Sequence, residues 1–288
     1  MQDTKDRKGI FTFVSLAKEK ENPMADRQFI RYTIEDRVAT LVIDHPPVNA
    51  FNTRTVLELN DALDELFANP EAKVIIITGG GQLAFVAGAD IGEINSIVTS
   101  ADARTRLEEA SSRGQAVFTK IEKAPKPVIA AINGVCLGGG LELAMACHIR
   151  ICGDRVRLGQ PEINLGIIPG WGGTQRLPRL VSKGKAIEII LTGDQITAQE
   201  AKALGLVNLV VPGDAVMRQA KGLAAKLASK SAIAIAAALE AINAGQGLPL
   251  AEGLAKECEQ FAQLAGTEDV REGPQAFLEK RQPQFKDK

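Results

Sequence analysis

Two glutamates within one glycine-rich stretch are the side chains of this chain best suited to acid–base chemistry. Glu142 follows a run of glycines, Gly138 to Gly140, and Glu162 lies in the sequence Gly-Gln-Pro-Glu. A charged side chain in an apolar run such as Leu141 to Cys147 is disfavoured in a core unless it is paired or used. Two carboxylates can act as general acid and general base, the pair needed to add water across a double bond. The stretch therefore predicts an acid–base site.

The glycines could supply backbone donors to this site. Leu141 to Cys147 shows no strand-like alternation and predicts a buried helix, with Gly138 to Gly140 at its N-terminus. The N–H groups of a first helical turn have no intrahelical partner, and the positive end of the helix dipole lies behind them. They suit an anion or a developing oxyanion. Close packing of this helix on a neighbour would require the same glycines, so both interpretations stay open here.

Structural roles are also open for the two carboxylates. Glu142 could complement the helix dipole at the surface, and Glu162 could pair with Arg155 or Arg157, which are near in sequence.

Several further motifs occur in one order from about Phe29 to the C-terminus. They are PPVNAFN at 46–52, AGADI at 87–91, NGVCLGGGLELAMAC followed by LGQPEINLGIIPGWGGTQRLPRL around the glutamates, LTGDQITAQEAKALGLVN at 191–208, and EGPQAFLEKRQPQF at 272–285. Together they resemble the crotonase (enoyl-CoA hydratase/isomerase) superfamily, and within it the short-chain 2-enoyl-CoA hydratases. The resemblance implies an α/β crotonase fold, a spiral of β-β-α turns with a helical C-terminal region that forms trimers.

The resemblance also implies a reaction and an assembly. The reaction is the syn addition of water to a 2-trans-enoyl-CoA, giving 3-hydroxyacyl-CoA, as in fatty acid β-oxidation. Coenzyme A is then part of the substrate, and no separate cofactor is expected. Members of the superfamily commonly form hexamers built as a dimer of trimers, so we expect a homotrimer or a homohexamer.

Carried over residue by residue, the resemblance assigns a role to each matching position. Glu142 and Glu162 would hold one water molecule between them, and the backbone N–H groups of Ala89 and Gly139 would form the oxyanion hole for the thioester carbonyl. Trp171 stands at a position that is often small in the family, where it could shorten the acyl pocket or serve in packing. The expected contacts with the acyl-CoA come from Ala87, Ala89, Asp90, Ile91, Gly92, Gly139 and Lys280.

The surroundings of the two glutamates suggest different roles. A helix N-terminus favours an ionised Glu142, which suits a base, whereas the apolar neighbours Ile163 and Leu165 should raise the pKa of Glu162, which suits an acid. A coupled pair titrates as a unit.

Besides Trp171, two positions depart from the family pattern. His148 stands where members usually have aspartate, which could alter a structural pairing. Gly92 stands where the mammalian hydratases have a lysine near the CoA, which removes one phosphate contact.

Other functions of the superfamily stay open at this point. They are Δ3,Δ2-enoyl-CoA isomerisation, acyl-CoA hydrolysis, ring hydration and, more distantly, RNA binding without catalysis. Both glutamates are present, whereas related isomerases often retain only one, and this favours hydration. The net charge of −1 and the single Trp and Tyr among 288 residues argue against nucleic acid and anionic membrane as partners.

Composition excludes several other classes of enzyme. With only His45 and His148 as histidines, we expect no histidine-rich metal site, and most Ser-His-Asp arrangements are excluded as well. The four cysteines lie mostly in apolar runs without CxxC spacing and read as reduced thiols. We therefore expect a cytoplasmic protein, or one of the mitochondrial matrix if the source is eukaryotic.

Strands and helices alternate before the chain becomes helical. Strands are predicted at 37–45, 73–78, 128–132 and 206–211, and helices after a cap at Asn52 or Thr53, over 99–121, and after a capping box formed by Thr197 and Glu200. This order indicates an α/β core followed by helices. Gly79 to Ala84 fits a dinucleotide-binding motif, but we reject that interpretation because no long amphipathic helix follows.

The predicted organisation has three parts: an N-terminal extension over 1–25 that we expect to be disordered, a spiral core over 26–212, and a helical region over 213–288.

Overall fold

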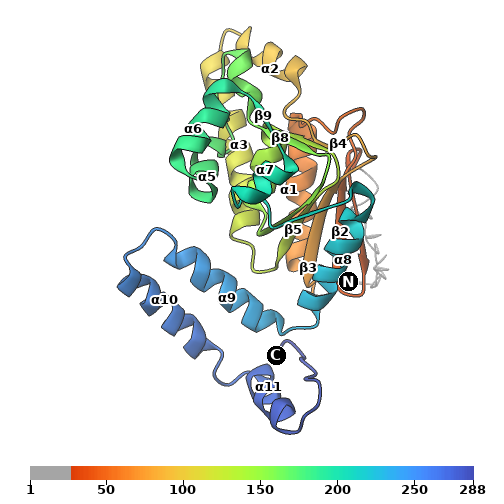
Figure 1. The fold of residues 1–288 in the computed structure, drawn as a ribbon, viewed down its shortest axis with the longest axis vertical. Helices are drawn as coiled ribbons and strands as arrows, with labels where there is room; N and C mark the ends of the chain where they lie inside the picture. The colour runs from red at the N-terminus through yellow and green to blue at the C-terminus, as the bar shows by residue number, and fades with distance from the viewer. Residues whose placement is uncertain (1–26) are drawn as a thin grey trace, which may run out of the picture.

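In the middle of the chain, consecutive strands enter two different sheets, and this alternation generates the fold (Figure 1). The computed structural model describes residues 27–288, so the predicted extension over 1–25 lies outside the described residues. The larger sheet has the order β1 (Ile30–Glu35), β2 (Val38–Ile43), β3 (Val74–Gly79), β5 (Val128–Ile132), β7 (Ile149–Gly153), β10 (Leu209–Val211). The smaller has the order β4 (Ala84–Val86), β6 (Val135–Leu137), β8 (Arg157–Gly159), β9 (Gln195–Thr197).

Each turn of the spiral contributes one strand to each sheet. β3, β5 and β7 are followed by β4, β6 and β8, and helical segments come next. Neighbouring strands are parallel except for the pairs β1–β2 and β8–β9. The predicted spiral of β-β-α turns is therefore confirmed.

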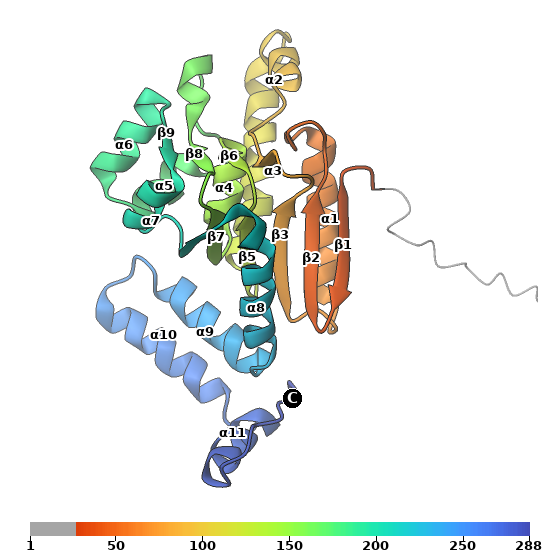
Figure 2. The ribbon, with the colours of Figure 1, turned by 45° about the vertical axis from the view of Figure 1, so that its right-hand side comes forward.

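Helices cover the sheets and fill the connections (Figure 2). Their bounds are α1 Thr53–Ala68, α2 Ile91–Val98, α3 Ala103–Glu122, α4 Gly139–Ala146, α5 Gly173–Leu180, α6 Lys183–Thr192, α7 Ala198–Ala203, α8 Val216–Ala228, α9 Ala232–Gly245, α10 Leu250–Gln263 and α11 Glu268–Leu278, with short 3-10 helices η2 Pro161–Leu165 and η3 Gly213–Ala215.

The larger sheet is buried on both faces, which explains its continuous apolar strands. In β3, Ile75 and Ile77 enter the core cluster shared with α1 and α3, while Val74 and Ile76 face α8. Successive side chains of a strand point to opposite faces, so a strand covered on both sides must be apolar throughout. Helix α8 is thus part of the core packing, although it lies within the predicted helical region.

Local capping signals are found where the sequence predicted them. The Asn52 side chain accepts from the backbone N–H of Thr55 at the start of α1, and Thr197 and Glu200 form a capping box at α7.

The structure differs from the predicted elements in three places. β1 was not predicted, although its antiparallel pairing with β2 makes it the edge of the larger sheet. The helix predicted over 99–121 is α3, which begins at Ala103. The short helix α2 before it, capped by Asp90, was not predicted. The last strand begins at Leu209 and not at Leu206, because 204–208 follow α7 as a turn in which Gly205 has a φ of +78°.

Helices α9 and α10 form a hairpin that extends away from the sheets (Figures 1 and 2). Neither helix contains a buried residue, although α9 has the apolar sequence AIAIAAALEAINAG. Among the described residues no single helix is long and apolar enough to cross a membrane, and one pair of helices bent by 105°, Gly213–Ala228 with Ala232–Gly245, passes that test only when the two are joined.

The C-terminal residues fasten the helical region to the sheet. Asp287 pairs with Lys73 at 2.8 Å and with Arg37 at 3.0 Å, and it accepts from the backbone N–H of Ala232 at 2.8 Å. Lys73 leads into β3 and Ala232 starts α9, so one carboxylate joins three distant segments.

Candidate active site

The two glutamates meet in a cavity of about 600 Å³ at the N-terminus of α4. Its wall comes from the loop before α2, from α2 and α3, from α4 and from the segment 161–174. Glu142 and Glu162 are the only titratable side chains among the described residues that line it. The remainder of the wall is mainly apolar, with Ile94, Ile97, Leu107 and Ile168. Such a cavity, apolar with a few convergent polar groups, is typical of a site for a small molecule.

Glu142 is buried and oriented by backbone donors. Its exposed fraction is 2%, which excludes the surface role considered from the sequence. The backbone N–H groups of Trp171 and Gly173 donate to Oε1 at 2.8 and 2.7 Å. Since no donor to Oε2 is found within the described part of the chain, this second oxygen is left for a ligand or a water molecule.

Glu162 lies in η2, next to Gly138 at the start of α4. With its nitrogen turned toward Glu162, the buried Gln160 amide donates to the two carboxylate oxygens at 2.9 and 3.1 Å. Gly138 leaves room for this carboxylate, because a Cβ built there would lie 2.9 Å from Glu162 Oε1. The proposed pairing with Arg155 or Arg157 is wrong: no ion pair joins them to Glu162 among residues 27–288.

Burial raises the pKa of both carboxyl groups to about 7. For Glu142, burial outweighs the hydrogen bonds from Gly173 and Trp171 and the positive charge of Arg176, all of which lower its pKa. For Glu162, burial acts first and the nearby Glu142 raises its pKa further. The effect of burial on the pKa of Glu142 was not foreseen from its position at the helix N-terminus. Near neutral pH the pair holds about one proton, as one acid and one base require.

Two backbone N–H groups, from neighbouring segments of the chain's fold, belong to residues that line the cavity. Phe51 donates its N–H to the Gly88 carbonyl at 2.9 Å and accepts from Asp90 N–H at 2.7 Å, so the N–H of the intervening Ala89 points away from Phe51. Gly139 is the first residue of α4, and its N–H has no intrahelical partner. Ala89 and Gly139 both line the cavity. They could therefore donate together to one ligand oxygen.

Trp171 closes the cavity beside Gly139. A Cβ at Gly139 would lie 2.7 Å from the indole Cζ3, and Gly114 of α3 is similarly close to the other edge of the ring. The indole N–H donates to the Ala110 carbonyl at 3.1 Å, and the ring packs edge-on against Phe51 and Phe118. These contacts hold the ring in one orientation.

Some of the expected acyl-CoA contacts are brought to the cavity and others are not. Ala87 and Ile91 line it together with Ala89 and Gly139. Asp90 instead caps α2, because its side chain accepts from Glu93 N–H at 3.0 Å. Gly92 is outside the lining.

Lys280 is not near the cavity of its own chain. It is exposed and follows α11, at the opposite end of the molecule from α2 (Figures 1 and 2).

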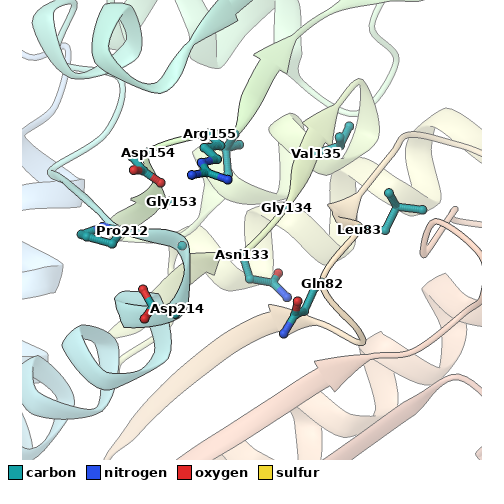
Figure 3. Close-up of a pocket in the computed structure, with 12 residues that line it drawn as sticks. Gln82, Leu83, Asn133, Gly134, Val135, Gly153, Asp154, Arg155, Pro212 and Asp214 are labelled. Carbon is teal, nitrogen blue, oxygen red and sulfur yellow. The ribbon is translucent and has the colours of Figure 1, made fainter.

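A second hollow of about 570 Å³ lies where β5, β7 and β10 end (Figure 3). Asp154 and Asp214 line it beside Arg155, so its charge does not favour an anionic ligand. It contains neither Glu142 nor Glu162.

Two further groups near the site were missed by the sequence reasoning. The Gln160 amide donates to the Glu162 carboxylate, and Arg176 donates to the carbonyl of Trp171, whose N–H donates to Glu142. The available signals were a glutamine two residues before Glu162 and an arginine three residues after Gly173. The departure at His148 has a structural use: its Nδ1 accepts from Val128 N–H at 2.9 Å, and its Nε2 lies 3.3 Å from the Glu122 carbonyl.

No cluster of His, Cys, Asp and Glu suited to a metal ion is found within residues 27–288.

Comparison with known proteins agrees with this architecture. Residues 33–288 match the family described as enoyl-CoA hydratase/isomerase, and the chain belongs to that family. It is 46% identical to a probable enoyl-CoA hydratase of Bacillus subtilis over 89% of this chain and 98% of the relative. It is 43% identical to the crotonyl-CoA hydratase of Syntrophomonas wolfei over 87% and 95% of the two chains. A solved enoyl-CoA hydratase from Bacillus anthracis superposes with a TM-score of 0.85 at 40% identity, over 91% of this chain and 100% of the other.

Proposed function

We propose that this protein is an enoyl-CoA hydratase that adds water to a short-chain 2-trans-enoyl-CoA. The observation that carries the proposal is the pair of buried carboxyl groups, Glu142 and Glu162, in one mainly apolar cavity with two unpaired backbone donors. The relatives named as crotonyl-CoA hydratase and as short-chain-enoyl-CoA hydratase support it.

The proposed reaction uses each of these groups once. The thioester oxygen accepts from Ala89 N–H and Gly139 N–H, which stabilise the negative charge that develops there as the double bond is attacked. The water molecule donates a proton to ionised Glu142 while the oxygen of the water forms a bond to Cβ of the substrate. Protonated Glu162 gives its proton to Cα, so the substrate gains one H and one OH.

The free Oε2 of Glu142 supports this assignment of roles. Oε1 is occupied by Trp171 N–H and Gly173 N–H, which favour a negative charge on this carboxylate. The remaining oxygen can then accept from water. Glu162 lines the same cavity, so its proton can be given to Cα of the same substrate.

The fixed ring of Trp171 supports a short acyl chain. It occupies the space beside Gly139, where the atoms beyond Cβ of a thioester held by the oxyanion hole would extend. In a hydrophobic pocket each methylene that does not fit costs roughly 10- to 200-fold in kcat/KM.

A hydration assay with 2-trans-enoyl-CoA esters of four to ten acyl carbons tests both points. We expect loss of the enoyl-thioester absorbance with crotonyl-CoA, and kcat/KM that falls as the chain lengthens. Trp171→Leu keeps the backbone N–H that Glu142 uses and should shift the preference toward the longer esters. Isomerisation of 3-enoyl-CoA without hydration of crotonyl-CoA would contradict the proposed reaction, and a flat dependence on chain length would contradict the role of Trp171.

The proposal includes an assembly of identical chains, a trimer or a hexamer. The apolar helix α9 has no buried residue, and Leu254, Phe261 and Phe277 of α10 and α11 are 53%, 77% and 82% exposed. Such a continuous apolar surface is typical of a protein–protein interface. Since Lys280 is far from the cavity of its own chain, any contact with a CoA phosphate would be made to a neighbouring chain in such an assembly.

Light scattering of the purified protein should therefore give the mass of three or six chains. Charge introduced by the paired substitution Phe261→Glu and Phe277→Glu should reduce that mass, because burying an unpaired carboxylate is costly. Matched replacements of the exposed polar residues Gln263 and Gln275 by glutamate should have a smaller effect. A fully active wild-type monomer would exclude the proposed assembly.

A further inference from the structure

Arg176 is a buried charge close to the site but outside the cavity wall. It belongs to α5 and is 9% exposed. Its Nη1 donates to the Trp171 carbonyl at 2.9 Å, and its Nε and Nη2 donate to Glu122 Oε2 of α3 at 3.3 and 2.9 Å. Nη2 also donates to Thr119 Oγ1 at 3.2 Å. The guanidinium group thus joins the turn before α5 to the end of α3.

That turn is the one that orients Glu142. Arg176 holds the carbonyl of Trp171, while the N–H groups of Trp171 and Gly173 donate to Glu142 Oε1. Gly172, between them, has a φ of +116°, and any Cβ there would overlap Arg176 Nη1. The sequence Trp-Gly-Gly therefore forms a turn that only fits around this guanidinium group.

We propose that Arg176 is a positioning residue for Glu142, holding the turn that donates to Oε1 and supplying the positive charge that favours the ionised base. This inference rests on the proposed function. It assigns no contact with substrate to Arg176, because the guanidinium group is not part of the cavity wall.

The charges around Glu142 determine the sign of the expected effect. They are Glu162 from η2, Arg176 from α5 and, paired to Arg176 at 2.9 Å, Glu122 from α3. Burial raises the pKa of Glu142 to about 7, and Arg176 acts against that rise. Removing the positive charge should raise this pKa further. Because the base must be ionised, activity should then be lost at a higher pH on the acidic side of the pH–rate profile.

The test is the pH dependence of crotonyl-CoA hydration by Arg176→Met and Glu122→Gln. For Arg176→Met we expect kcat to fall about 10- to 100-fold, the range typical of outer-shell partners of metal-site ligands, with little change in KM. The acidic limb of its pH–rate profile, where activity is lost as the pH falls, should move to higher pH. Glu122→Gln leaves Arg176 in place without its counter-charge, so its acidic limb should move to lower pH. Arg179→Met, an exposed arginine of the same helix, should leave kcat and the profile unchanged.

The opposite shifts separate an electrostatic role from a merely structural one. Arg176→Lys, which keeps the charge but cannot reproduce the forked contacts, should retain the wild-type limb with a reduced kcat. If Arg176→Met does not fold, the downward shift in Glu122→Gln still decides the question. An acidic limb that stays at its wild-type position in the folded Arg176 and Glu122 variants would overturn the inference, whereas a wild-type chain that does not hydrate crotonyl-CoA would overturn the proposed function instead.

Discussion

Glu142→Gln and Glu162→Gln should each lower kcat by roughly 10²–10⁴, the usual contribution of a positioned acid or base. An amide has nearly the same shape as a carboxyl group but can neither accept the proton from water nor deliver one to Cα. The cavity wall is otherwise intact, so KM for crotonyl-CoA should change little. Steady-state kinetics at neutral pH measure both values, and the double variant should lose much less than the product of the two single effects.

The pH profile adds a second readout for this pair. Wild-type activity should be bell-shaped around neutral pH, because below both apparent pKa values no base remains and above them no acid remains. In Glu142→Gln the carboxylate that raises the pKa of Glu162 is gone. The pKa of Glu162 should therefore fall, and one of the two limbs of the pH–rate profile should disappear.

Glu58→Gln is a suitable control for the loss of a buried carboxylate. Glu58 is 8% exposed and accepts from the N–H groups of Phe29 and Ile30, away from the cavity. It should lower the melting temperature and leave kcat unchanged. Near-normal turnover by either of the two site variants would contradict the acid–base assignment.

Removing the N–H of residue 139 should lower kcat by roughly 10²–10³, the effect of losing one donor of an oxyanion hole. Side-chain substitution is a poor test here, because a Cβ at Gly139 would lie 2.7 Å from the Trp171 ring. Replacing Gly139 by glycolic acid changes the amide to an ester and deletes only the donor. The loss should appear in kcat more than in KM, since negative charge on the thioester oxygen develops in the transition state.

The matched control is the same amide-to-ester change at Leu143, whose N–H lies within α4 beyond its first turn. It removes a hydrogen-bond donor from inside the helix, so it perturbs α4 at least as much as the change at 139, without removing a donor from the cavity. An ester at 139 that hydrates crotonyl-CoA as fast as the Leu143 control would mean that the thioester oxygen is held elsewhere, and our placement of the substrate against α4 would be wrong.

Local patterns were sufficient for much of the fold. The capping side chains of Asn52 and Thr197, the apolar run of β3 and the glycines before Glu142 act over a few residues, and the structure has the elements that they predict. Helix α2 and the edge strand β1 were missed, because they depend on a cap at Asp90 and on pairing with β2.

The sequence by itself determined which residues could do the chemistry, since the types and order of Ala89, Gly139, Glu142 and Glu162 carry the family motifs. Only the tertiary structure decided the state of these groups. The pKa of Glu142 follows from burial and from donors on a turn about thirty residues later, and Arg155 and Arg157 are not paired with Glu162 although they are close in sequence. Desolvation and hydrogen bonding depend on what packs around a group in space, and in this chain those neighbours come from α3, η2 and the turn before α5.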